Sequence, residues 1–124
     1  MAYYACIRAN ASFPKVFSII ATSFGNVHIE EYQTKQNALI GIVIGQDYIR
    51  SSQEFVGMII LLEEFEKYTI IKYIALGSIV KPSESTFIKK CKEELQELIS
   101  ILSEQGITVE ILEENPHYFR EYGD

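Results

Sequence analysis

No apolar run in this 124-residue sequence approaches the ~20 residues that a membrane-spanning helix needs. The first residues, Met1 to Tyr4, also lack the basic and apolar regions of a secretory signal. Cysteine is scarce, and Cys6 and Cys91 lie far apart, each among apolar residues. We expect both to be buried, unpaired thiols in a reducing compartment. These absences predict a cytoplasmic protein with no membrane partner.

Histidine is equally scarce. His28 and His117 are the two histidines, and neither has a second ligand at metal-binding spacing other than scattered glutamates. A metal site needs several such ligands to converge, so we expect none. The sequence also lacks a P-loop, the G-x-G-x-x-G fingerprint and the G-x-S-x-G nucleophile elbow. We therefore predict no cofactor and no catalytic residue, which favours a protein that is not an enzyme.

Carboxylates are common, but their spacing does not suit acid–base catalysis. Neighbouring residues of a strand point to opposite faces, so adjacent glutamates in strands do not converge in one cleft. The sequence has three such pairs, Glu30-Glu31, Glu63-Glu64 and Glu113-Glu114. Solvated charges at strand ends, which also protect sheet edges from aggregation, are the better interpretation.

Basic residues are in the minority. The chain carries 17 acidic against 11 basic side chains, a formal net charge of −6. Such a surface repels phosphate backbones unless its cations cluster. The longest basic run, Lys89 to Lys92, belongs to a predicted helix that soon turns acidic. We therefore expect no nucleic-acid partner.

Two apolar runs with a short charged segment between them occupy the centre of the chain. They cover residues 55–62 and 68–76 and are rich in β-branched and aromatic side chains. This pattern predicts two strands joined by a hairpin. Both faces of the first run are apolar, so the strand is covered on both faces or lies within an oligomer.

Helical spacing appears twice. A first helix is predicted to begin after the N-cap Ser12 and to end at Gly25 in the left-handed conformation. Its apolar stripe contains Phe13, Val16, Phe17, Ile20, Ala21 and Phe24. A second, longer helix begins at Ser83 or Ser85 and ends at Gly106, with a stripe of Phe87, Cys91, Leu95, Leu98 and Leu102. Its glutamates Glu93, Glu94 and Glu97 are assigned to the opposite side.

Four further segments are predicted strands, at residues 3–9, 27–32, 38–44 and 107–112. In the second of these, we expect Val27 and Ile29 to face the core. The polar segment 45–54 is either a loop or an extension of the flanking strands as a hairpin. Asn115-Pro116 is expected to end the last strand.

The order is therefore β-α-β-β-β-β-α-β, which predicts one α+β domain over residues 1–116 and a polar and aromatic tail over 117–124. We expect an antiparallel sheet of five to six strands with two helices packed on one face. Over residues 3–105 this order resembles the helix-grip architecture of START and Bet v1-like lipid-binding proteins, and it is similar to TATA-binding-protein-like folds. The first resemblance implies a pocket for an apolar ligand between the long helix and the sheet. The acidic charge argues against the DNA-binding role of the second.

The leading functional hypothesis is a non-catalytic interaction module that associates with itself as a homodimer, because two helices cannot cover both faces of such a sheet. We assign the open face, and hence the interface, to Met58, Ile71 and Tyr73, on the reasoning that Lys72 extends past the helices on the alternate face. An alternative cover is the tail, with Tyr118 and Phe119 as plugs. The competing function is a small apolar-ligand-binding protein, with or without catalytic activity. The polar segment before the central strands supplies the candidate binding residues Tyr48, Arg50 and Ser52.

Overall fold

The computed structural model describes residues 1–50, 53–77 and 83–118. It confirms the predicted α+β class and the order of elements. Along the chain these elements are β1 (Ala2–Ala9), α1 (Phe13–Phe24), β2 (His28–Gln33), β3 (Leu39–Ile49), β4 (Glu54–Glu64), β5 (Thr69–Leu76), α2 (Glu84–Glu104) and β6 (Val109–Asn115). Neither helix of the described part is long and apolar enough to cross a membrane.

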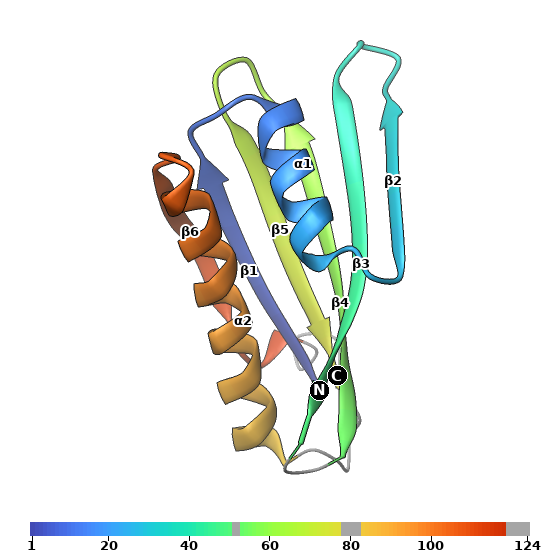
Figure 1. Cartoon of the computed structure of the whole chain (residues 1–124), viewed down its shortest axis with the longest axis vertical. Helices are drawn as coiled ribbons and strands as arrows, with labels where there is room; N and C mark the ends of the chain where they lie inside the picture. Colours follow the sequence, from blue (N-terminus) through green and yellow to red (C-terminus); the bar gives the residue numbers. More distant parts are fainter. Residues whose placement is uncertain (51–52, 78–82, 119–124) are drawn as a thin grey trace.

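The strands form one six-stranded sheet in the order β2-β3-β4-β5-β1-β6, and each neighbouring pair is antiparallel. Strands β2 to β5 form a meander, and β1 lies between β5 and β6. Both helices lie on the same face of the sheet, with α1 in front of the β3–β4 side and α2 in front of the β1–β6 side (Figure 1). The sheet therefore has one covered face and one open face.

The helix ends follow from local chemistry. Ser83 has the extended conformation of an N-cap, and its hydroxyl accepts a hydrogen bond from the Thr86 amide at 3.3 Å. Gly106, one residue beyond the C-cap of α2, has a φ of 79°, which favours glycine. Gly25 ends α1 for a different reason than expected, because its φ is −84°. A Cβ atom at Gly25 would lie 2.6 Å from Ile29 Cγ1, so close packing requires the glycine.

The core lies between the helices and the covered face. The buried residues of α1 and α2 are largely the apolar stripes read from the sequence. They pack on alternate residues of the four inner strands, among them Ile7, Val43, Val56, Ile60, Leu62 and Ile71. Both thiols are unpaired, and Cys91 is buried, as the sequence predicted. Cys6 is only half-buried, because it points to the open face together with Lys72, its partner across the β1–β5 ladder.

Two strand predictions need correction or completion. The polar segment 45–54 is a hairpin extension, since β3 runs to Ile49 and β4 begins at Glu54. Strand β2 was expected to bury Val27 and Ile29, but these residues are 55% and 45% exposed. The reason is its position, because β2 is an edge strand beside β3 and its side chains have neighbours on one side only.

Candidate functional site

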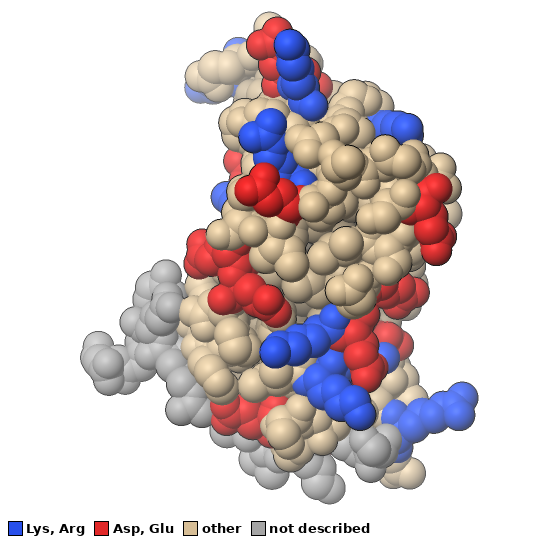
Figure 2. Space-filling view, turned by 90° about the vertical axis from the view of Figure 1, so that its left-hand side faces the viewer, with Lys and Arg blue, Asp and Glu red and all other residues tan. Residues whose placement is uncertain are grey.

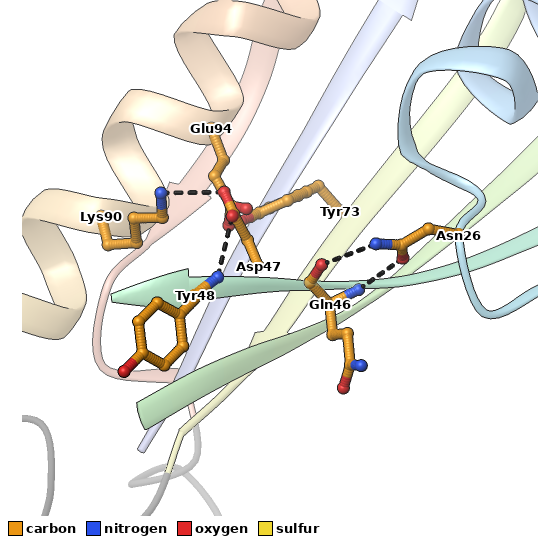
Figure 3. A network of polar contacts seen from close by, with 7 residues as sticks. All are labelled: Asn26, Gln46, Asp47, Tyr48, Tyr73, Lys90 and Glu94. Carbon is orange, nitrogen blue, oxygen red and sulfur yellow. Dashed lines mark hydrogen bonds and ion pairs between the residues drawn. The ribbon is translucent and has the colours of Figure 1, made fainter. Parts of the chain in front are cut away.

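The predicted binding residues do not form one site. Tyr48 is 42% exposed on the open face, where its ring lies 5.1 Å from that of Phe55, its partner across the ladder. Arg50 lies in the exposed turn after β3. Ser52 lies outside the described residues. The neighbour of Tyr48, Asp47, points the other way and contacts α2 (Figure 3).

The predicted interface residues Met58, Ile71 and Tyr73 lie on the covered face. They are 3%, 0% and 0% exposed and belong to the core beneath the helices. Their assignment to the open face is therefore wrong. The physical reason is that Lys72, on the alternate face, reaches solvent directly and pairs with Glu63 at 2.7 Å. Neither helix of the described residues lies over Lys72, so its side chain has no helix to extend past.

The open face of the sheet is apolar at its centre. Residues that oppose one another across antiparallel ladders share a face, and the registers place Ile44, Ile59 and Ile74 in one row across β3, β4 and β5. The aliphatic residues of this face, which are all partly exposed, are Ile40, Ile42, Ile44, Ile59, Leu61, Ile70 and Ile74. Phe55 and Leu76, which are 56% and 50% exposed, extend this apolar area of the open face.

Aromatic and charged side chains border the open face at its β1 side. The Arg8 guanidinium lies 3.9 Å above the ring centroid of Tyr68, which stacks on Phe65. Tyr118 stacks on Tyr4 with centroids 4.8 Å apart. Of the two tail residues named as an alternative cover, Tyr118 contacts Tyr4 of β1 at this border, and Phe119 lies outside the described residues.

A second feature is a buried polar cluster where α2 meets the end of β3. Glu94 of α2 is 3% exposed, and its Oε1 accepts a hydrogen bond of 2.8 Å from the Tyr73 hydroxyl. The Glu94 carboxyl also hydrogen-bonds with that of Asp47. Lys90 Nζ lies 2.8 Å from Asp47 Oδ2, and the Tyr48 amide donates to Asp47 Oδ1 at 2.8 Å. The side chains converge from β3, β5 and α2 (Figure 3).

The two carboxyl groups of this cluster differ in acidity. The pKa of Glu94 rises from its ordinary 4.5 to about 7. Burial is the main cause and the nearby Asp47 adds to it, while the Tyr73 hydrogen bond and the charge of Lys90 oppose the rise. Burial also raises the pKa of Asp47, but its hydrogen bonds with Lys90 and the Tyr48 amide outweigh this, and the net shift is downward. Asp47 is therefore the stronger acid of the pair, and Glu94 is the member that keeps its proton below about pH 7.

A small hollow lies beside the cluster, between the end of α1, β3 and α2. Its volume is about 170 Å³, and its walls include Ser23, Asn26 and Glu97 as well as the two carboxyls. The Asn26 side chain fixes one wall, since it donates to the Gln46 carbonyl at 3.0 Å and accepts from the Gln46 amide at 2.9 Å (Figure 3). The space between α2 and the sheet thus has a polar opening rather than an apolar one at this end.

The sequence contained a signal for Glu94 that the assignment of α2 faces missed. Glu94 follows Phe87 by seven residues and Cys91 by three, so helical spacing puts it on the apolar stripe. Its partner Asp47 is distant in sequence, and only the packing of α2 on β3 brings the two together. The cluster can hold one proton between two carboxyls. Among the described residues no group of three or more His, Cys, Asp or Glu could hold a metal ion.

The surface that carries α2 and β6 shows acidic and basic side chains interspersed around an uncharged area (Figure 2). The described residues of this side therefore do not form the continuous basic stripe on which nucleic-acid binding depends.

Comparisons of the chain with protein-family models, with curated proteins and with solved structures find no match.

Proposed function

We propose that this chain is a non-catalytic interaction module that associates with a second copy of itself through the open face. The observation that carries the proposal is the row of partly exposed isoleucine and leucine side chains across β3, β4 and β5. Contiguous apolar patches of this kind are rare on soluble monomers and mark interaction surfaces.

The size of the open face suits a dimer. At about 3.4 Å per residue and about 4.8 Å between strands, the face from β2 to β1 covers roughly 700 Å². Each partner of a standard protein–protein interface contributes about 800 Å². Two sheets stacked face to face, about 10 Å apart, would therefore bury an area of the size that a stable pair needs.

The charges on this face favour a second copy over a charged partner. Lys72 is already paired with Glu63, and the Arg8 guanidinium lies on the Tyr68 ring. Both cations thus have contacts within the chain, and neither stands alone as an attachment point for an acidic partner. An apolar surface can pair with a second copy of itself, as a two-fold interface requires.

The alternative, a small apolar-ligand-binding protein, has less support. The ligand would occupy the space between α2 and the sheet, but Phe87, Leu95, Leu98 and Leu102 are buried there in the core. The hollow at the end of that space is lined largely by carboxyl and amide groups, with Phe24 and Met58 beside them. An apolar ligand gains little from such walls, because burying their polar groups without partners costs free energy.

Leu61→Asp tests self-association. Leu61 lies at the centre of the open face, so an aspartate there would place a charge in the interface while leaving the covered face intact. Light scattering coupled to size-exclusion chromatography should show a dimer for the wild-type chain and a monomer for the variant, with unchanged circular dichroism. The matched control is Ile111→Asp, because Ile111 is 48% exposed on β6 and opposes the buried Ile7, away from the open face. This control should remain a dimer.

Two results would contradict the proposal. One is a wild-type chain that stays monomeric at millimolar concentration. The other is a Leu61→Asp variant that stays dimeric with the wild-type affinity. If the monomeric wild type bound an apolar fluorescent dye and Leu61→Asp abolished that binding, the open face would belong to a partner other than this chain.

A further inference from the structure

The polar cluster between β3 and α2 has more carboxyl groups than cations. Asp47 and Glu94 face each other, and Lys90 lies against Asp47. Glu94 is 3% exposed, so a second negative charge there is poorly solvated. Two carboxylates in contact in such a site cannot both be ionised without a large cost, and one of them keeps a proton.

From this geometry we propose that Asp47 and Glu94, the carboxyl pair, form a proton-dependent contact that holds α2 on the end of β3. While Glu94 keeps its proton, it donates to Asp47 and accepts from Tyr73. When the proton is lost, two carboxylates oppose each other and the contact between α2 and β3 loosens. The inference is independent of self-association, because the pair lies on the covered face.

The groups that face Glu94 determine the pH at which this happens. They are Asp47 from β3, Tyr73 from β5, and Lys90 and Cys91 of α2 itself. Two exposed glutamates of α2 lie nearby, since Glu93 acts on Lys90 and Glu97 lines the same hollow. Burial and the Glu94 charge raise the pKa of Tyr73, and burial raises that of Cys91 to about 12, so both stay neutral as Glu94 titrates. Lys90 is the cation nearest the pair, and its own contact is with Asp47. Nothing in this set compensates a charge on Glu94 fully.

The sign of the pH effect follows from linkage. The folded state raises the pKa of Glu94 from 4.5 to about 7, so it binds the proton more tightly than the unfolded state does. Its stabilising contribution is complete below pH 4.5 and is lost as the pH rises to about 7. Above that pH, α2 should be held less firmly on the sheet.

Glu94→Gln provides the test, because glutamine has the shape of a protonated glutamate and can donate to Asp47 at every pH. We expect the variant and the wild type to be about equally stable at pH 5. At pH 8 the unfolding equilibrium constant of the variant should be on the order of a hundredfold lower than that of the wild type. Backbone amides of α2 should exchange hydrogen more slowly in the variant than in the wild type at pH 8, and equally at pH 5. The control is Glu97→Gln, which removes the same charge from an exposed position beside the same hollow and should show no pH-dependent difference.

A second measurement follows Glu94 directly. The carboxyl carbon of Glu94, observed by NMR, should titrate near neutral pH in the wild type and at a lower pH in Asp47→Asn, which lacks the opposing charge. The proposal is overturned if Glu94 titrates in the ordinary carboxylate range, or if Glu94→Gln is destabilised equally at both pH values. Equal α2 exchange in wild type and variant at pH 8 would also overturn it.

Discussion

Lys72 shows how one side chain defines a face of the sheet. It lies on the open face, where Glu63 accepts from its ammonium group and raises its pKa. Covering this face with helices would bury Lys72 and Arg8, and burying charged groups is costly even when they are paired. The opposite face of β5 carries Ile71, Tyr73 and Ala75, which the helices can cover without such a cost.

Truncating Leu98 and truncating Phe17 to alanine should lower the free energy of unfolding by different amounts. Leu98 is 1% exposed, so Leu98→Ala should lose about 2–5 kcal/mol of unfolding free energy through lost burial and a residual cavity. Phe17 is only partly buried against Phe13, and Phe17→Ala should lose less, on the order of 1–3 kcal/mol. Denaturant titration would measure both.

The control for these variants is Ser103→Ala, at an exposed position of α2, which should change stability by less than about 0.5 kcal/mol. Equal losses at Leu98 and Phe17 would show that α1 is buried as deeply as α2.

At the scale of elements, two glycines let α1 approach β3. A Cβ atom at Gly41 would lie 2.5 Å from a ring carbon of Phe17, and one at Gly45 would lie 2.1 Å from the backbone oxygen of Phe24. A ring can shift, but the helix backbone cannot move without disturbing its packing on the sheet. The position of α1 therefore depends most on Gly45.

Gly45→Ala should destabilise the fold by about 1–3 kcal/mol, because the new methyl group forces the end of α1 away from β3. Gly57→Ala is the matched control on the neighbouring strand, where a Cβ atom would meet nothing within 4 Å. Removing a flexible glycine there should be neutral or slightly stabilising. Thermal unfolding of both variants measures the difference, and a Gly45→Ala chain as stable as the control would refute the tight contact.

At the scale of the whole molecule, one layer of helices lies on one layer of sheet. Both helices lie on the covered face, and within the part of the chain that the structure describes no helix lies over the open face (Figure 1). Self-association would convert these two layers into four, with the sheets inside. Stability would then depend on the concentration of the chain as well as on its sequence.

The wild-type melting temperature should therefore rise with protein concentration, by on the order of a few °C for each tenfold increase. Leu61→Asp should melt at one temperature at all concentrations, whereas Ile111→Asp should keep the wild-type dependence. Differential scanning calorimetry over two decades of concentration would measure this. A wild-type melting temperature that does not change with protein concentration would argue against a dimer.

The sequence alone predicts the elements and their order, because the periodicities of 2 and 3.6, the Ser83 cap and the Gly106 stop are local features. It could not decide which face of the central strands is covered, since both faces are apolar and the helices that choose between them are distant in sequence. It could not identify β2 as an edge either, because strand neighbours are set by pairing along the whole chain. The Asp47–Glu94 contact also depends on residues that are distant in sequence. Helical spacing can bury Glu94, but only the docking of α2 on β3 supplies the second carboxyl and the buried surroundings that raise its pKa.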